Sequence, residues 1–305
     1  MAEFLLATLI AVALDQFVPH RWGLDPFVWY KDWVATIEQR FNGGERYQGW
    51  GALALALIPV ALAVLLIRFI LSQIGWPVRF VFDVVVLYFC LDLYRLNLRA
   101  IELTTALEEG RLIEANERLR ALGGKGAPRE TEAAIATASV QTVFELANVA
   151  TIAPLCWFLL LGPVGAVVQR MTGILGQSWG YRNDRFMEFG QPTRRFSTLL
   201  SWVPARITAI SFAMVGNFED ALHNWRRQSE LWLDNSGPLR AAGFGAMNLR
   251  YAEYNENADD EGMTDTPEAS HVRRALALVW RVVLLWLMLL VLAAAGDLLT
   301  LFSGW

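Results

Sequence analysis

The sequence predicts an all-α, polytopic membrane protein with about four transmembrane helices, broken or re-entrant segments, and helical insertions on the cytosolic side. Three observations lead to this prediction. The chain is 55% hydrophobic and 18% charged, whereas soluble domains average about 45–50% and about 25%. Residues 50–67 contain no charged side chain and, at about 1.5 Å per helical residue, nearly match the thickness of a hydrocarbon core. Residues 275–302 form a second long apolar stretch.

The first elements are expected to cross or line a membrane. Residues 4–18 predict a retained helix that faces the bundle and shields Asp15 from lipid, because the basic segment and cleavage site of a signal peptide are lacking. A polar amphipathic loop follows at residues 19–49. The crossing at 50–67, which can extend to residue 74, contains Pro59, and this proline frees one backbone carbonyl that a neighbour must satisfy.

The third apolar stretch, residues 80–93, carries two acidic side chains, Asp83 and Asp92. Each of them either pairs with an arginine such as Arg79 or Arg95, or marks a ligand or proton site within the membrane. Both interpretations remain open from the sequence.

Two later apolar segments are interrupted or short. Pro154 and Gly162-Pro163 interrupt residues 146–169, which favours a broken or re-entrant helix as much as a plain crossing. Residues 207–218 are too short to span alone and predict a second re-entrant piece. The expected parts are an N-terminal membrane region, a cytosolic helical hairpin, a core with broken helices, cytosolic helices with a loop, and a C-terminal crossing: 1–94, 95–142, 143–218, 219–274 and 275–305.

The charged residues predict the sidedness of the chain and limit its partners. Basic side chains concentrate in residues 19–49, 95–142 and 170–274, so the positive-inside rule places these segments in the cytosol and both termini outside. No polybasic tail is present for nucleic acid. Cys90 and Cys156 lie in apolar runs, and the three histidines are scattered, so we expect neither a disulfide nor a metal site.

One polar, arginine-rich segment stands out in this hydrophobic chain. It runs from Gly180 to Gly190 and is followed by Arg194-Arg195 and Pro204-Ala205-Arg206. The planar guanidinium group suits phosphates and carboxylates. The segment therefore predicts either an anion-binding site or a charged belt that binds lipid headgroups. The candidate ligand-binding residues here are Tyr181, Arg182, Asp184, Arg185 and Arg206.

Short motifs in a fixed order resemble the CobD/CbiB family of membrane proteins over roughly residues 140–251. These motifs are Glu145, Ala153-Pro154-Leu155, Gly162-Pro163, Gly180-Tyr181-Arg182-Asn183, Pro204-Ala205-Arg206, and Asn235-Ser236-Gly237 with the small residues up to Ala246. The resemblance implies the chemistry of members that make cobamides. They join adenosylcobyric acid to an aminopropanol phosphate, using ATP and magnesium.

The chain departs from the acidic pattern of those members. Val149 replaces the aspartate expected after Glu145, Gly173-Ile174-Leu175-Gly176 stands where the family has Asn-Thr-Leu-Asp, and Ser197-Thr198 stands where it has two aspartates. Magnesium in phosphoryl transfer is usually held by carboxylates and phosphate oxygens. The departures thus predict loss of the metal-binding carboxylates.

A second branch of this superfamily, AmpE, is similar in Trp202-Val203-Pro204, in Gly216 to Trp225, and in Trp22 to Asp25. Its members are inner-membrane proteins linked to β-lactamase induction and cell-wall recycling. The resemblance implies a non-catalytic sensor in the bacterial inner membrane, with no cofactor, that binds an anionic small molecule and lies in a lipid bilayer, alone or as a homo-oligomer. Glu145 and Asn148 would position the arginines, and no residue is assigned to catalysis or to a metal.

Two alternatives stay open. In the first, the chain is a diverged adenosylcobinamide-phosphate synthase, an ATP- and magnesium-dependent amide ligase, in which Glu145, Asp184, Glu219 or Asp220 replaces the missing metal ligands. In the second, it is a structural membrane subunit whose arginines only pair with the acids of residues 95–142. Dependence on ATP and magnesium separates the ligase from the sensor.

Overall fold

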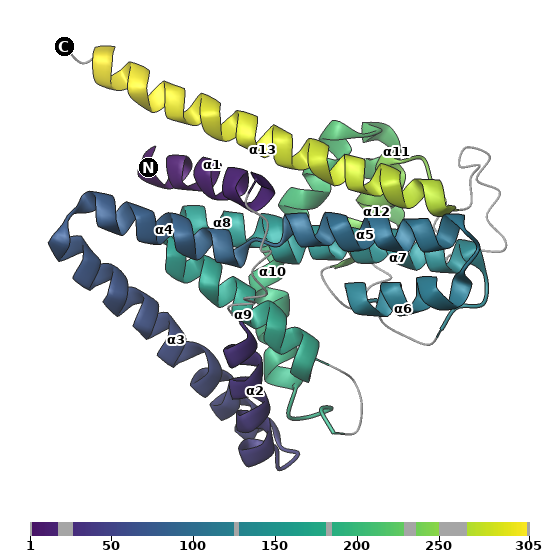
Figure 1. The fold of residues 1–305 in the computed structure, drawn as a ribbon, viewed down its shortest axis with the longest axis horizontal. Helices are drawn as coiled ribbons and strands as arrows, with labels where there is room; N and C mark the ends of the chain where they lie inside the picture. The colour runs from purple at the N-terminus through teal and green to yellow at the C-terminus, as the bar shows by residue number, and fades with distance from the viewer. Residues whose placement is uncertain are drawn as a thin grey trace. The chain divides into compact units, whose positions relative to one another are not determined.

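The computed structural model describes residues 2–17, 27–124, 128–180, 185–228, 236–249 and 267–303, and every element within these ranges is a helix (Figure 1). The helices are α1 Ala2–Phe17, α2 Val28–Phe41, α3 Arg46–Ile74, α4 Trp76–Cys90, α5 Leu93–Glu108, α6 Leu112–Leu122, α7 Glu132–Ala147, the π-helical turn η1 Asn148–Ile152, α8 Ala153–Leu161, α9 Pro163–Trp179, α10 Gln191–Val215, α11 Phe218–Gln228, α12 Ser236–Ala246 and α13 Ala269–Ser303. The predicted all-α fold is confirmed.

The chain forms two compact units. Unit 1 comprises Met1–Asp92, Val149–Trp202 and Leu290–Trp305, and unit 2 comprises Leu93–Asn148 and Val203–Leu289. Unit 1 therefore holds α1 to α4, α8 and α9, whereas unit 2 holds α5 to α7, α11 and α12. The division falls inside η1, α10 and α13.

Within the described residues, four helical runs are long and apolar enough to cross a membrane: Arg46–Ile74, Glu132–Leu161, Gln191–Val215 and Ala269–Gly296. Their number agrees with the prediction, but only some of them are the segments that we expected to cross. We expected residues 4–18 and 80–93 to cross, but α1 has 16 residues and α4 has 15, fewer than the about 20 that a perpendicular crossing needs. Residues 207–218 are not a separate re-entrant piece, because residues 207–215 are the last part of α10 and α11 begins at Phe218.

The acidic residues of unit 1 find arginine partners from other helices. Asp83 on α4 has a side chain that is 5% exposed, and it accepts hydrogen bonds from Arg68 on α3, with the closest N–O distance at 3.0 Å. Asp92 pairs with Arg170 on α9 at 2.7 Å. The structure thus supports the ion-pairing interpretation for both carboxylates, through Arg68 and Arg170. Asp15 is buried, at 1% exposure, as predicted.

The Arg68–Asp83 pair gives a first testable expectation. Arg68→Ala leaves the buried Asp83 carboxylate without its cation, which should cost about 3–5 kcal/mol of unfolding free energy. The thermal unfolding midpoint, followed by circular dichroism in detergent, should fall by several degrees. Adding Asp83→Asn removes the uncompensated charge and should recover part of the loss. An unchanged midpoint in Arg68→Ala would contradict this account.

The break predicted near Pro154 is a widened turn rather than a chain reversal. Proline lacks an N–H group, so Pro154 cannot donate to the carbonyl of Ala150. The backbone N–H of Asp92 donates to that carbonyl instead, at 3.1 Å, and the chain forms the π-helical turn η1 before continuing as α8. The reversal comes later, at Gly162, whose φ of +67° suits glycine and lets α9 return along α8.

Pro204 lies inside α10 for a similar reason. It frees the carbonyl of Leu200, and the indole N–H of Trp157 on α8 donates to this oxygen at 3.0 Å. The side chain of one helix thus satisfies the backbone of another, which is how apolar surroundings tolerate a helical proline. The sequence predicted a separate re-entrant piece at residues 207–218, and this contact explains how the helix continues through Pro204 instead.

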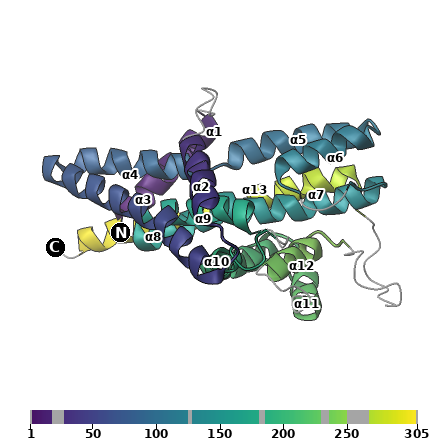
Figure 2. The ribbon, with the colours of Figure 1, turned by 90° about the horizontal axis from the view of Figure 1, so that it is seen from below.

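Unit 2 is organised around α7 and α12. Figures 1 and 2 both show α5, α6 and α7 side by side, and these helices pack on one another. Phe144 on α7 lies against the rings of Phe212 on α10 and Phe244 on α12, with centroids 4.8 and 6.2 Å away. All three rings are at most 1% exposed. This aromatic core fixes the helix faces that carry the polar residues described below.

Candidate functional site

Close packing of α12 against α7 determines where one arginine reaches. A Cβ at Gly243 would lie 2.5 Å from Cε2 of Phe144, so only glycine permits this approach. Residue 240 precedes Gly243 by three positions and therefore shares its face of α12. The side chain of Arg240 is thus directed at α7, next to Phe144.

Arg240 forms an ion pair with Glu145. Its Nε lies 2.5 Å from Oε1 of Glu145, and its Nη2 contacts the same oxygen. The side chain of Arg240 is 16% exposed and that of Glu145 is 28% exposed. Partial burial strengthens the attraction between the two charges relative to a surface pair, while the remaining exposure leaves the carboxylate open to a bound molecule.

Asn148 extends this polar cluster by one turn. It occupies the first position of the π-helical turn, a feature often found at functional sites. Its Oδ1 accepts a hydrogen bond from Oγ1 of Thr208 on α10 at 2.9 Å, and both side chains are buried. Arg206 lies two residues before Thr208 on α10 and is partly buried. Unit 2 thus brings Glu145 and Asn148 into one cluster with Arg240 and Thr208.

Arg240 and Thr208 were not singled out from the sequence. A signal for Arg240 was present, since it is the only charged residue between Asn235 and Leu249, in a stretch rich in glycine and alanine. A lone charge on such a small-residue helix indicates a specific partner. No comparable signal marks Thr208, because threonine is common on buried helices.

The described end of the arginine-rich segment, residues 185–190, is held by helices of unit 1. Arg185 pairs with Glu38 on α2 at 2.6 Å, and its backbone carbonyl accepts a hydrogen bond from Asn42. Arg46, at the start of α3, binds the carboxylate of Glu188, and this hydrogen bond lowers the pKa of Glu188 below its ordinary value. The described loop, residues 185–190, is therefore fixed to the corner between α2 and α3. We call it the anchored loop.

The seven predicted ligand-binding residues are described unequally. Tyr181, Arg182 and Asp184 lie outside the described residues. Arg185 belongs to unit 1, whereas Glu145, Asn148 and Arg206 belong to unit 2. The predicted single pocket of all seven residues therefore stays a prediction.

The positions where the family pattern is acidic come together in unit 1. A Cβ at Gly173 would lie 3.1 Å from Cγ1 of Val149, and a Cβ at Gly176 would lie 3.5 Å from Oγ of Ser197. One face of α9 therefore meets η1 and α10 at these sequence-distant positions. Among the residues that the structure describes, no group of three or more His, Cys, Asp or Glu side chains could hold a metal ion. The described residues here do not fit a carboxylate-held magnesium.

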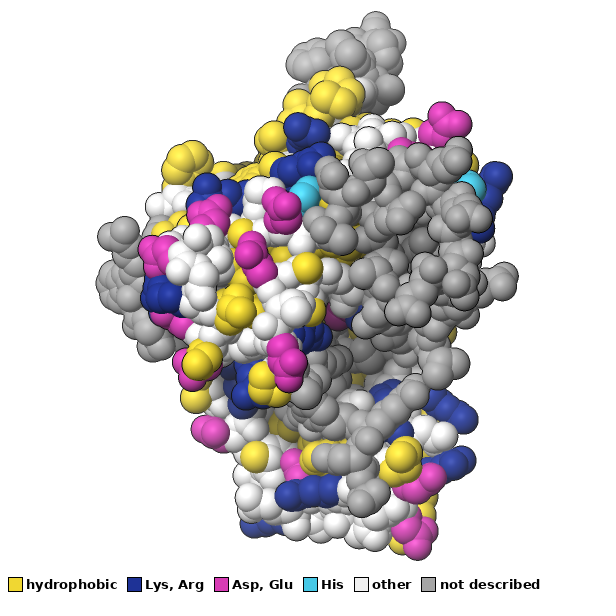
Figure 3. All heavy atoms as spheres, turned by 90° about the vertical axis from the view of Figure 1, so that its right-hand side faces the viewer, with side chains coloured by type: hydrophobic (Ala, Val, Ile, Leu, Met, Phe, Trp, Pro, Cys, Tyr) yellow, Lys and Arg dark blue, Asp and Glu magenta, His cyan; other side chains and the backbone are white. Residues whose placement is uncertain are grey.

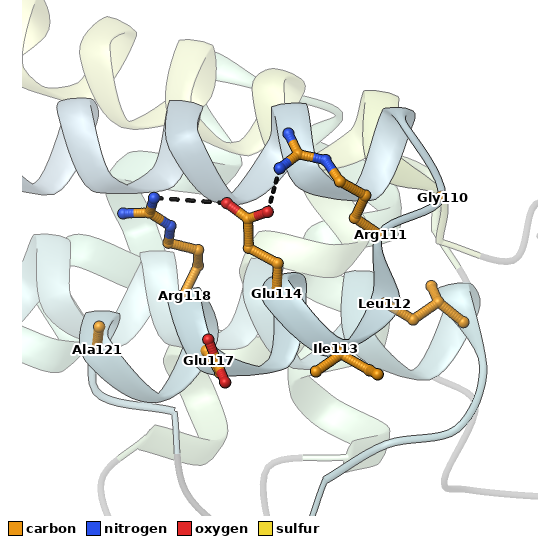
Figure 4. Close-up of a pocket in the computed structure, with 8 residues that line it drawn as sticks. All are labelled: Gly110, Arg111, Leu112, Ile113, Glu114, Glu117, Arg118 and Ala121. Carbon is orange, nitrogen blue, oxygen red and sulfur yellow. Dashed lines mark hydrogen bonds and ion pairs between the residues drawn. The ribbon is translucent and has the colours of Figure 1, made fainter.

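A separate hollow of about 860 Å³ lies along α6 in unit 2 (Figure 4). Arg111 and Arg118 line it, and both bind Glu114. Because these guanidinium groups are neutralised by neighbouring carboxylates, the hollow offers no surplus charge for an anionic ligand. Figure 3 likewise shows acidic and basic side chains interspersed rather than one patch of a single sign. None of the predicted site residues lines this hollow.

Comparison with known proteins decides the family. The model of the family described as CobD/Cbib protein matches residues 8–279. The chain belongs to the CobD/CbiB family. Among its relatives, the cobalamin biosynthesis protein CobD of Stutzerimonas stutzeri is 33% identical over 312 residues, covering 98% of both chains. The protein of the same name from Chromobacterium violaceum is 34% identical, covering 93% of this chain and 95% of the relative.

A more distant relative in this CobD/CbiB family, the cobalamin biosynthesis protein CobD of Halalkalibacterium halodurans, is 28% identical over 76% of this chain. No solved structure matches the chain. The family and the four apolar helical runs together make this a multi-pass membrane protein.

These findings overturn one prediction. The AmpE-like sensor of β-lactamase induction is wrong, because the relatives that match along nearly the whole chain are cobalamin biosynthesis proteins. The sensor interpretation arose because this chain lacks several acidic residues of the family pattern. Over nearly its whole length, however, the chain is 33–34% identical to proteins named for cobalamin biosynthesis.

Proposed function

We propose that this protein is an adenosylcobinamide-phosphate synthase of cobalamin biosynthesis. It would form an amide bond between the carboxyl group of adenosylcobyric acid and the amine of an aminopropanol phosphate, with loss of water driven by ATP. One observation carries the proposal, namely the match to a cobalamin biosynthesis protein across 98% of both chains.

The polar cluster in unit 2 suits an anionic substrate. Arg240 provides a guanidinium group that binds phosphate or carboxylate oxygens, and we assign the same role to Arg206 on α10 from its Pro204-Ala205-Arg206 motif. The Glu145 carboxylate keeps the Arg240 fork in one orientation, and it is exposed enough to meet a substrate amine. Separately, the family motif favours a substrate-binding role for Tyr181, Arg182, Asp184 and Arg185, the last of which lies in unit 1.

ATP and magnesium enter this proposal as a substrate complex rather than as a resident group. Val149, Gly173, Gly176 and Ser197 cannot replace the carboxylates of the family pattern. We therefore assign no described residue to magnesium and route no step of the reaction through it.

The chain is proposed to lie in the cytoplasmic (inner) membrane of a bacterium. A site that consumes ATP would face the cytosol, where ATP is present. Association with further copies is compatible with this placement but is not required by the proposed reaction.

The proposal is tested by direct synthesis. The purified protein in lipid nanodiscs is incubated with ATP, magnesium, adenosylcobyric acid and aminopropanol phosphate, and mass spectrometry detects the condensed amide. We expect product that requires ATP and disappears in Glu145→Ala. An absence of product, while an active family member produces it under the same conditions, would overturn the proposal.

A further inference from the structure

Helix α2 exposes two tryptophans on one face. Trp29 is 53% exposed and Trp33 is 42% exposed, although a residue of this size is usually covered in a folded protein. An adjacent side of α2, about a quarter turn from the tryptophans at 3.6 residues per turn, is packed, since Tyr30, Val34 and Ile37 are at most 4% exposed. At helical spacing, Trp29 and Trp33 share a stripe with Thr36 and Arg40.

The start of α3 exposes two further aromatic side chains. Tyr47 is 68% exposed and Trp50 is 51% exposed, and both lie at the beginning of the uncharged stretch of α3. Residue 58, at the same helical face as residues 47 and 50, is an isoleucine that is 54% exposed. The face of α3 that bears these aromatics is therefore the face that continues into the apolar, uncovered part of the helix.

We propose that α2 lies at the lipid–water interface and that Trp29, Trp33, Tyr47 and Trp50 form one interfacial aromatic belt of unit 1. Tryptophan and tyrosine concentrate at this depth because their rings are apolar while their N–H and O–H groups need water or headgroups. The occupant of the exposed face is a phospholipid surface. It is favoured over a protein partner because the aromatic face continues directly into the exposed apolar face of a membrane-crossing helix.

The charges on α2 agree with this placement. Arg40 ends the tryptophan stripe, where its guanidinium can reach lipid phosphates while its stem lies on apolar surface. Lys31 and Asp32 are exposed on other faces of the helix, which would then meet water.

An interfacial α2 also places the anchored loop at the membrane surface. Glu38 and Asn42 at the end of α2, and Arg46 at the start of α3, hold residues 185–190. The loop is therefore fixed at the membrane surface. The inference does not depend on which reaction the protein catalyses.

The test measures the depth of single positions along α2. In a background in which the two buried cysteines, Cys90 and Cys156, are replaced by alanine, single cysteines at Trp29, Trp33, Asp32 and Ala35 receive a nitroxide label in nanodiscs. Collision rates with oxygen, which concentrates in lipid, and with a water-soluble nickel complex are compared. We expect the oxygen-to-nickel ratio at Trp29 and Trp33 to exceed that at Asp32 and Ala35 by at least about three-fold.

Two outcomes would overturn the inference. One is an equal ratio at all four positions, which would show that the tryptophan face lies no deeper in lipid than the rest of the helix. The other is low accessibility to both reagents at Trp29 and Trp33 together with cysteine cross-linking between copies, which would make this face a contact with a second chain. Labelled variants must unfold within a few degrees of the background, and Thr36 on the same stripe replaces any position that fails.

Discussion

Replacement of Arg240 by alanine is expected to reduce formation of the condensed amide by at least about 100-fold, the size of effect seen when one charge-stabilising donor is removed from an active site. Arg240 donates through Nε and Nη2 to one oxygen of Glu145, so its loss frees the carboxylate to rotate and removes a cation from the site. Arg240→Lys keeps the charge but not the two-point fork, and should retain only part of the activity.

Stability must be separated from activity in this experiment. Loss of one partner should also cost about 1–3 kcal/mol of unfolding free energy, because both side chains are partly exposed. Combining Glu145→Met with Arg240→Met replaces the pair by apolar side chains and should recover the unfolding midpoint. Activity should remain absent. A double variant that regains both stability and activity would show that the pair is only structural.

An exposed pair in the same unit supplies the control. Arg273 and Glu108 have side chains that are 58% and 37% exposed, with an N–O distance of 2.6 Å. Surface pairs contribute about 0–1 kcal/mol. Arg273→Ala should therefore leave both the unfolding midpoint and the yield of amide unchanged. An equal loss in Arg273→Ala and Arg240→Ala would mean that the assay reports general destabilisation.

The second large effect is expected for Gly49→Ala. A Cβ at this position of α3 would collide with the backbone oxygen of Phe189 and would lie 3.1 Å from Cγ of Pro192. Because the colliding atom belongs to the backbone, the anchored loop itself must move. We expect a loss of about 1–3 kcal/mol of unfolding free energy, and at least about a ten-fold loss of activity, since a shift of about 1 Å at a site has large kinetic effects.

A matched control lies two residues further along the same helix. A Cβ at Gly51 would meet no atom within 4 Å, so Gly51→Ala should be neutral or stabilising by up to about 1 kcal/mol through helix propensity. Thermal unfolding in detergent and the amide assay are measured on both variants. Equal midpoints for Gly49→Ala and Gly51→Ala would contradict the close contact between α3 and the anchored loop.

The candidate site could be predicted only in part. Glu145 was singled out because its motif resembles a family, and Asn148 because it follows on the same interrupted helix; the structure places both in the polar cluster of unit 2, and their role in binding stays a prediction. Arg240 was missed because its role depends on a partner 95 residues away in the chain. No local pattern encodes such a pairing, since the approach of α12 to α7 is made by Gly243 and Phe144.

The sequence by itself determined the all-α class, the membrane character and the family, because hydrophobic run length, the scarcity of charge and motif order are properties of the linear chain. Only the tertiary structure decided which helices are continuous and which charges pair. Pro154 and Pro204 each free a carbonyl, and a donor from elsewhere in the chain satisfies it: the N–H of Asp92 in one case and the indole of Trp157 in the other. Such donors come from segments far apart in the sequence, so the outcome of a proline, or of a buried aspartate such as Asp83, depends on packing that sequence spacing does not specify.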